Sequence, residues 1–393
     1  MVAAAHQAPG PLSGVTVLDL STVGPASRCT RLLADYGAAV VKVGPVPGPD
    51  APGTTPPPHA YAAGRGTRRL CLDLRRPEGR DAFLDLASGA DVVVESFRPG
   101  VVARLGIGYE AVRARNPGIV YVSTSGYGQE GARAGWAGHD LDYLAVGGYL
   151  AMTEPLGDGR PPLPGATIAD SAAGGMQAAL AVCAALVRRG AGGEGTYLDV
   201  AVADGVLWLM SLVLEEELAG AGTPVPGHDV LSGRYACYGT YAAADGRHVA
   251  VAAIEPKFFA NLCAALGCGQ WAAAQYDEGC QEELRAVLAA AFLRRPRDDW
   301  AAELAGADTC VAPVLAVEEV AADGAFAARG AFVEARRPDA AAFRQLAPVL
   351  AGMPRPPGPV EVPGPGTDTE ALLAAAGYPP ARVGELLAAG VVA

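Results

Sequence analysis

The stretch that decides the fold begins with Val15–Leu20 (VTVLDL) and ends with Ala39–Val43 (AVVKV). Both runs are rich in β-branched residues and predict strands. Between them, Pro25 suits the first turn of a helix, and residues 28–36 have helical spacing with adjacent leucines on one side. A strand, a helix and a second strand in this order form a crossover unit, which predicts a parallel sheet.

The same alternation continues along the chain. Residues 70–74 (LCLDL), 91–95 (DVVVE), 119–124 (IVYVST) and 196–202 (TYLDVAV) predict strands. Predicted helices lie between or after them, at residues 77–88, 171–189 and 204–218. The middle helix is almost entirely small and apolar, so we expect it to be buried. The expected fold class is therefore α/β, with a doubly wound, Rossmann-like large domain.

Changes in composition divide the chain into parts. Residues 220–227 are rich in Gly and Pro and lack periodicity, which indicates a domain boundary. Residues 45–58 predict a loop, and residues 352–366 (GMPRPPGPVEVPGPG) predict an extended strap on the surface. The expected domains are a large Rossmann-like domain over 1–220, a smaller α+β domain over 228–325, and a return strap with C-terminal helices over 326–393.

The charge and composition exclude several classes of protein. A formal net charge of −12 argues against a nucleic-acid binder, whose affinity depends on clustered Lys and Arg. Gly, Asp or Arg interrupts the longest apolar runs, so no stretch is expected to span a membrane. Residues 1–10 lack the pattern of a secretory signal. We expect a cytoplasmic protein with reduced cysteines, and the abundance of Ala, Gly, Pro and Arg is typical of a GC-rich bacterium.

One glycine-rich motif has the spacing of a nucleotide-binding loop. Gly190–Gly195 (GAGGEG) matches the dinucleotide pattern, but that loop must follow a strand and open a helix. Here the motif follows a predicted helix and precedes a predicted strand, so we interpret it as a turn. The cysteines and histidines lack the spacing of a zinc site, and no metal site is expected.

His139 and Asp170 are the best candidates for acid–base chemistry. His139 lies between Gly138 and Asp140 at the start of a predicted helix, and imidazole titrates near neutral pH. Asp170 begins a glycine-containing helix, where a ligand can approach closely. Each residue has a structural alternative, since His139 can bond to backbone at a helix start and Asp170 can be an N-cap. Asp140 is expected to be the N-cap of its own helix.

A third carboxylate and a group of arginines are further candidates. Glu255 lies between a predicted strand and helix, where it either starts the helix or orients a histidine. Six arginines flank the strand at 70–74 and the segment at 99–101. They either form a phosphate-binding lip or are solvated charges: Arg65, Arg68, Arg69, Arg75, Arg98 and Arg104.

These features together resemble the family III CoA-transferases (CaiB/BaiF type), and within them the α-methylacyl-CoA racemases. The similarity runs from Leu12 to the C-terminus. The motifs PLSGVTVLDLSTVGP, ADVVVESFRPGVVARLGIG, GHDLDYLAVGG, GEGTYLDVAVADG and DTCVAPV follow one another in the family's order. Each motif is short, but their order over the whole chain identifies it as a member of the family.

The resemblance implies an interlocked homodimer, with each active site between the large domain of one subunit and the small domain of the other. Glu255 would then approach His139 across the interface. The resemblance implies an acyl-CoA substrate and no cofactor beyond the CoA that the substrate carries. The residues that it assigns to CoA binding are Lys42, Leu72, Asp73, Leu74, Arg75, Arg98, Gly100, Val101, Arg104, Gly138, Asp140 and Tyr143.

The resemblance implies two reactions. In a racemase or epimerase, His139 and Asp170 lie on opposite faces of the α-carbon of a 2-methylacyl-CoA and invert it by proton transfer through an enolate. In a CoA-transferase, Asp170 is instead a nucleophile that forms an acyl anhydride. A third possibility is a relative that uses a substrate without CoA or only binds, because Val43-Gly44-Pro45 and Gly64–Thr67 depart from the family pattern.

Overall fold

The structure is a computed structural model that describes residues 10–48, 60–348 and 350–393. Most of the loop expected at 45–58 and the N-terminal residues 1–9 fall outside these ranges. The chain divides into two compact units. Unit 1 consists of residues 1–148, 163–211 and 324–393, and unit 2 consists of residues 149–162 and 212–323. Unit 2 thus begins before the Gly/Pro-rich segment at 220–227, and the chain after it returns to unit 1.

Unit 1 is built on a six-stranded parallel sheet, as the sequence predicts. The strand order is β3-β2-β1-β4-β5-β6. The strands are β1 (Thr16–Asp19), β2 (Ala39–Gly44), β3 (Thr67–Cys71), β4 (Val92–Glu95), β5 (Val120–Ser125) and β6 (Thr196–Ala201). The order reverses between β1 and β4. In such sheets the ligand crevice lies at the carboxyl ends of the strands beside this reversal.

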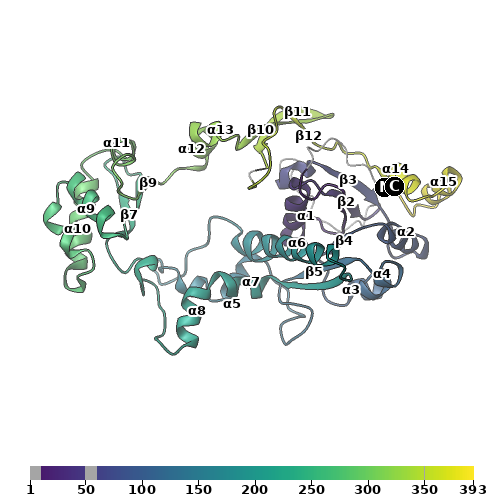
Figure 1. Cartoon of the computed structure of the whole chain (residues 1–393), viewed down its shortest axis with the longest axis horizontal. Helices are drawn as coiled ribbons and strands as arrows, with labels where there is room; N and C mark the ends of the chain where they lie inside the picture. The colour runs from purple at the N-terminus through teal and green to yellow at the C-terminus, as the bar shows by residue number, and fades with distance from the viewer. Residues whose placement is uncertain (1–9, 49–59, 349) are drawn as a thin grey trace. The chain divides into compact units, whose positions relative to one another are not determined.

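Helices cover both faces of this sheet (Figure 1). Side chains of neighbouring residues in β1 pack on opposite faces of the sheet, since Val17 belongs to one core cluster and Leu18 to the other. The first face carries α1 (Gly24–Asp35) and α6 (Gln177–Gly190), and the second carries α2 (Pro77–Ser88) and α4 (Tyr109–Arg115). Three further helices of unit 1 are α3 (Val101–Leu105), α5 (Asp140–Val146) and α7 (Val202–Leu209).

The last seventy residues of unit 1 form a small sheet and three helices, two of which cover the second face of the large sheet. The elements of this segment are α13 (Gly324–Ala328), β10 (Phe332–Arg337), β11 (Ala340–Leu346), β12 (Val360–Glu361), α14 (Thr369–Ala375) and α15 (Pro380–Ala388). Leu372 of α14 and Leu386 of α15 are buried in the same core cluster as Leu18. Val392 pairs with Leu72 in an antiparallel bridge. Within the expected strap, β12 pairs with β10, and Val362 is buried.

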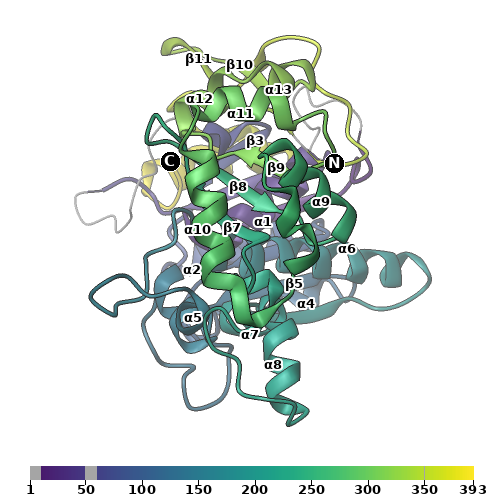
Figure 2. The same ribbon diagram turned by 90° about the vertical axis from the view of Figure 1, so that its left-hand side faces the viewer.

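Unit 2 contains a separate three-stranded antiparallel sheet, β7-β8-β9. An antiparallel hairpin is formed by β7 (Tyr238–Ala242) and β8 (His248–Ala252), and β9 spans Val311–Pro313. Figure 2 shows α9 (Pro256–Ala265) and α10 (Gln281–Phe292) beside these strands, where Phe259 and Phe292 enter the core. The remaining helices are α8 (Ser211–Leu218), α11 (Arg297–Leu304) and α12 (Val317–Ala322).

Two predicted helices differ in the structure. The helix expected at 204–218 is divided into α7 and α8 around Met210. The helix expected at 171–189 begins with a π-helical segment, η3 (Ala169–Met176), that continues into α6. π-Helical turns are rare and frequently occur at functional sites.

The joined helix Ala169–Gly190 also differs from the expectation that no stretch has the character of a membrane span. By length and apolar composition alone it could cross a membrane. A helix packed in a protein core can have the same composition, and Ala178, Val182 and Ala185 of this helix are buried in the core cluster on the first face of the sheet.

Candidate active site

His139 lies at the start of α5, after the carboxyl end of β5. It is the N-cap residue of α5, and its backbone N–H donates to Asp142 Oδ2 at 2.9 Å. The Tyr143 hydroxyl donates to the Gly138 carbonyl oxygen at 2.6 Å and so braces the turn before His139. The backbone of His139 is therefore fixed by its neighbours, while its side chain is exposed in the single chain.

One hydrogen bond joins the two helix starts that carry His139 and Asp170. The Asp170 N–H donates to Asp140 Oδ1 at 2.8 Å, and Asp140 directly follows His139. Two expected caps are therefore corrected. Asp140 is the first residue of α5, and its carboxylate serves η3 instead of capping its own helix. Asp170 lies within η3, whose N-cap residue is Ile168.

Glycines allow η3 to approach α1 closely. A Cβ added to Gly174 would lie 2.6 Å from Pro25 Cβ, and one added to Gly175 would lie 2.7 Å from Arg28 Cβ. The approach brings Asp170 Oδ2 to 3.9 Å from the position of a Cβ on Gly24, the first residue of α1. The carboxylate thus lies over a residue without a side chain, which leaves room for a ligand.

The surroundings of Asp170 alter its acidity. Burial raises the pKa of its carboxyl group, the charge of Asp140 raises it further, and Arg28 and His139 lower it. The effect of His139 places the two groups within electrostatic reach. Arg28 is held by a hydrogen bond from Nη2 to Thr167 Oγ1 at 2.6 Å. A raised pKa makes the carboxyl group a better proton acceptor and so suits it to acid–base chemistry.

Tyr143, an expected CoA contact, also supports the turn that precedes His139. Its side chain is buried, and burial and the charge of Asp170 raise its pKa to about 12. Its hydroxyl is already bonded to Gly138. Tyr143 therefore remains neutral and holds the turn that carries His139.

A pocket of about 510 Å³ opens at the carboxyl ends of β1, β2 and β3. Its base is organised by Asp19, which is fully buried and accepts hydrogen bonds from Ser21 Oγ, Thr30 Oγ1 and Lys42 Nζ. The Lys42 ammonium, an expected CoA contact, lies 2.5 Å from Asp19 Oδ2 and is neutralised by it. The lining adds the guanidinium groups of Arg31, Arg69 and Arg337, of which Arg31 pairs with Asp35 and Arg337 with Asp339. Arg69 is thus the guanidinium group of this lining that suits an anionic part of a ligand.

Of the six candidate phosphate-binding arginines, Arg69 lines the pocket described above, and the other five separate into two groups. Arg65 is buried and pairs with Asp35, and Arg68 pairs with Asp368, so these two are structural and do not form an exposed lip. Arg75 follows β3, and Arg98 and Arg104 follow β4. All three side chains are exposed, and in the described ranges none of them forms an ion pair with a carboxylate.

The other expected CoA contacts lie at the same sheet edge. Leu72 is buried, and the Asp73 N–H donates to the Val391 carbonyl oxygen at 2.9 Å, so the C-terminal residues support this segment. Leu74 packs against the core. Gly100, with φ of 80°, precedes α3, and Val101 begins it.

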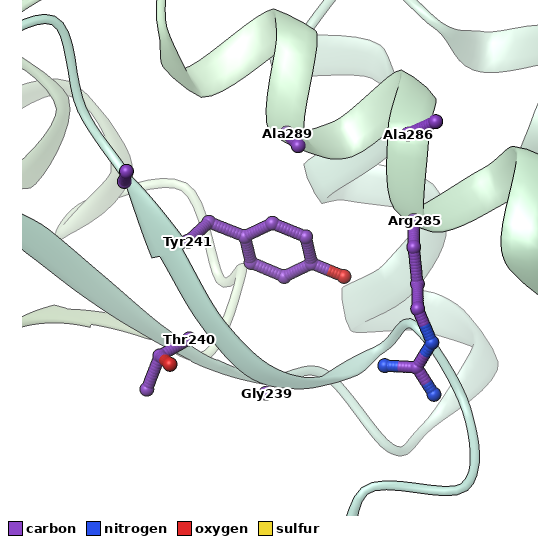
Figure 3. A pocket seen from close by; sticks show the side chains of 7 residues that line it. Gly239, Thr240, Tyr241, Arg285, Ala286 and Ala289 are labelled. Atoms are coloured by element: carbon purple, nitrogen blue, oxygen red, sulfur yellow. The ribbon is translucent and has the colours of Figure 1, made fainter. Parts of the chain in front are cut away.

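Glu255 belongs to unit 2, whereas His139 and Asp170 belong to unit 1. It is the N-cap residue of α9, its side chain is exposed, and that side chain does not cap the helix. Unit 2 also has a hollow of about 370 Å³ between β7 and α10 (Figure 3). Its Arg285 donates to the carbonyl oxygens of Gly233 and Arg234, and its lining contains no histidine or carboxylate. This hollow therefore lacks an acid–base pair.

Several residues of the site are absent from the sequence-based prediction. Gly24 lies within the quoted motif PLSGVTVLDLSTVGP but was not assigned to the site. The other residues lie outside the quoted motifs: Arg28, Arg31, Thr167 and Arg337. Among the described residues, no group of three His, Cys, Asp or Glu side chains is arranged to hold a metal ion. The glycine-rich motif at 190–195 joins α6 to β6, as the turn interpretation predicts.

Comparison with known proteins links this site to a family. The sequence model described as CoA-transferase family III matches residues 12–369. Alpha-methylacyl-CoA racemase from Homo sapiens is 34% identical, over 93% of this chain and 94% of its own. Succinyl-CoA--D-citramalate CoA-transferase from Chloroflexus aurantiacus is 31% identical, over 91% of each chain.

A solved structure agrees with these matches. The crystal structure of a CAIB/BAIF family protein from Brucella suis has a TM-score of 0.75 and 26% identity, and covers 94% of this chain and 100% of its own. The curated relatives are racemases and CoA-transferases, so the chain is an enzyme of this broad kind. The sequence model covers most of the chain, and the parallel α/β fold agrees with it. The chain belongs to CoA-transferase family III.

Proposed function

We propose that this protein is a racemase or epimerase that inverts the α-carbon of a 2-methylacyl-CoA thioester. The observation that carries this proposal is the hydrogen bond from the Asp170 N–H to Asp140 Oδ1, which joins the two helix starts that carry His139 and Asp170. A CoA-transferase needs the carboxylate but has no step for the histidine. The similarity to the Homo sapiens racemase over almost the whole chain supports the same conclusion.

In this mechanism the two side chains act on opposite faces of one carbon. One of them, His139 or Asp170, removes the α-proton, and the electron pair moves onto the thioester oxygen to give an enolate. The other returns a proton to the opposite face. No redox change occurs, and each turnover leaves the two groups with exchanged protonation states. The raised pKa of Asp170 brings its proton affinity closer to that of an imidazole, which favours transfer in both directions.

CoA would lie along the carboxyl edge of the sheet. The pocket of about 510 Å³ and the exposed Arg75, Arg98 and Arg104 supply cationic groups for its phosphates. CoA enters as part of the substrate, and the proposed chemistry uses no other cofactor or metal. The remaining contacts of the thioester come from the segment at Leu72–Arg75.

We further propose that the active enzyme is an interlocked homodimer in which Glu255 of one subunit orients His139 of the other. Three large apolar side chains of the joined π/α helix are 58–75% exposed in the single chain: Met176, Leu180 and Val187. Exposed apolar surface of this kind marks a protein interface. We place the enzyme in the bacterial cytoplasm, where acyl-CoA thioesters are available.

A second candidate function is CoA transfer. The similarity to the Chloroflexus aurantiacus transferase covers 91% of the chain, and the carboxylate of Asp170 lies over Gly24, where an acyl group can reach it. In this reaction the carboxylate attacks the thioester carbonyl, CoA leaves as a thiolate, and an acyl anhydride forms. The thiolate then attacks the Asp170 carbonyl, which releases the donor acid and leaves CoA as a thioester on Asp170. The acceptor acid attacks this thioester to form a new anhydride, and the released thiolate attacks the acceptor's acyl carbonyl to give the new acyl-CoA and free Asp170.

One experiment separates these functions. The protein is incubated with a 2-methylacyl-CoA in deuterium oxide, with and without an acceptor acid. We expect deuterium at the α-carbon without acceptor, and its loss in His139→Ala and Asp170→Asn. Acyl exchange that requires acceptor, survives His139→Ala and stops in Asp170→Asn would instead establish the transferase.

The matched controls lie outside the site. His248→Ala on β8 and Asp158→Asn, which alters an exposed carboxylate, should retain full activity. Absence of both reactions, with no binding of CoA by calorimetry, would show that the chain uses a substrate without CoA or has only a binding role.

A further inference from the structure

Glu95 is a buried acid that the proposed proton transfers do not use. It is the last residue of β4, the strand beside β1 at the reversal of strand order. Its side chain is 1% exposed, and burial raises its pKa to about 7. Burying a carboxyl group is costly unless its oxygens receive hydrogen bonds. The contacts of Glu95 therefore indicate what it holds in place.

The carboxyl group of Glu95 joins a strand to a turn. Its Oε2 accepts a hydrogen bond from the Phe97 N–H at 2.6 Å, and its Oε1 accepts one from Ser123 Oγ of β5. Its backbone oxygen accepts another from Thr124 Oγ1 at 3.1 Å. Ser123 and Thr124 are buried in the sheet, so the rigid β5 strand fixes the carboxyl group, which in turn fixes the backbone at Phe97.

The turn that Glu95 holds carries exposed positive charge. Residues 96–100 connect β4 to α3, and Arg98 in this turn is exposed without an ion-pair partner in the described ranges. The turn ends at Gly100 in a left-handed conformation, and a Cβ added there would lie 3.4 Å from Arg104 Nη1. Arg104 therefore lies against the same turn as Arg98. Two guanidinium groups on one turn suit the phosphates of an acyl carrier.

We infer that Glu95 is a positioning residue that anchors the turn at 96–100, so that Arg98 and Arg104 are held where the phosphates of the acyl-CoA bind. The identity of this ligand rests on the proposed function, whereas the anchor itself does not. Without the carboxyl oxygen, the Phe97 N–H loses its acceptor and the turn is released from β5. Binding of the thioester then suffers, while the acid–base groups at His139 and Asp170 keep their geometry.

The test compares two replacements of Glu95. Glu95→Leu removes both acceptors, so KM for the acyl-CoA should rise on the order of tenfold while kcat changes little. Glu95→Gln should rescue binding, because its amide oxygen can accept from Phe97 and its amide nitrogen can donate to Ser123. Glu110→Leu, on the exposed side of α4, is the matched control and should leave both constants unchanged. A wild-type KM in Glu95→Leu, or a fall in kcat alone, would overturn the inference.

A double-mutant cycle tests whether Glu95 acts through Arg98. Arg98→Ala alone should raise KM, and adding Glu95→Leu should raise it little further. If the increase in KM of the double variant equals the product of the increases in the two single variants, Glu95 does not position Arg98 and the inference is overturned.

Hydrogen exchange of the unliganded wild-type protein tests the anchor without any variant. The Phe97 amide should exchange at least tenfold more slowly than the Arg98 amide, because only the former donates to a buried acceptor. Equal rates would show that the anchor is absent, even if Glu95→Leu fails to fold. If the wild type turns over no acyl-CoA, the proposed function fails, and the exchange rates still decide whether Glu95 anchors the turn.

Discussion

At the scale of single residues, the chemistry depends on how Asp170 is surrounded. Burial and the adjacent Asp140 charge raise its pKa, while Arg28 and His139 lower it. Asp140 has two effects, because its Oδ1 also accepts the Asp170 N–H. Replacing the Asp140 carboxylate by an amide of the same shape would remove its charge and keep its hydrogen bond to the Asp170 N–H.

Asp140→Asn should move the acidic limb of the pH–rate profile to lower pH. The amide oxygen can still accept the Asp170 N–H, but the negative charge that raises the Asp170 pKa is gone. A lower pKa keeps Asp170 ionised at lower pH, so kcat/KM should fall at lower pH than in the wild type. The measurement is kcat/KM for α-deuteration from pH 4 to pH 8, with Asp158→Asn as control. A shift of this limb to higher pH would contradict the assignment.

At the scale of elements, the site depends on how closely η3 packs against α1. Gly174 and Gly175 provide the space, and the π-helical segment then continues into the regular helix α6. A side chain at either glycine would push η3 away from α1. Asp170 lies one turn earlier on η3 and would move with it.

Gly175→Ala should therefore reduce kcat by about tenfold to a hundredfold, since misplacement of a reacting group by about 1 Å has effects of this size. The added methyl would meet Arg28 Cβ at 2.7 Å. Gly190→Ala, at the end of α6, has open space around the new methyl and should behave as the wild type. Activity assays and circular dichroism of both variants provide the test. Equal kcat values would show that the close packing does not place Asp170.

At the scale of the whole molecule, the C-terminal residues complete the core around the N-terminal sheet, and a second subunit is proposed to complete the active site. Val391 and Val392 are buried, and Val392 pairs with Leu72, the first residue of the segment expected to contact CoA. The chain therefore returns over more than three hundred residues to close the core of unit 1. Glu255 belongs to unit 2, so its proposed role depends on assembly.

Val392→Ala should lower the free energy of unfolding by about 2 kcal/mol, because it removes two methyl groups from a closed core. Val317→Ala is the matched control, since Val317 is 85% exposed and its truncation should change stability by less than about 0.5 kcal/mol. Urea denaturation followed by tryptophan fluorescence measures both. Equal midpoints would show that the C-terminal residues do not stabilise unit 1.

Hybrid dimers test the shared active site. Co-expressed His139→Ala and Glu255→Ala chains are each inactive alone, and their purified hybrid dimer should have about half of wild-type activity, because one of its two sites is intact. If both residues act within one subunit, every site carries one substitution and no activity returns. The measurement is α-deuteration by the purified, differently tagged hybrid.

Much of the architecture was predictable because local patterns encode it. Runs of β-branched residues, Pro25 and Pro77 at helix starts, and the alternation of strands and helices led to the parallel sheet. The π-helical start at Asp170 was not predictable, because it depends on packing against α1. The break at Met210 was also missed, because the apolar pattern of 204–218 continues across it.

The sequence by itself determined the parallel α/β fold of this protein and the residue types available for proton transfer, because periodicity and side-chain chemistry are local properties. Only the tertiary structure decided that the Asp140 carboxylate binds the Asp170 backbone, that Asp19 neutralises Lys42, and that Glu95 joins β5 to Phe97. These contacts join residues up to 30 positions apart, and their geometry arises only when the sheet brings several strand ends to one edge.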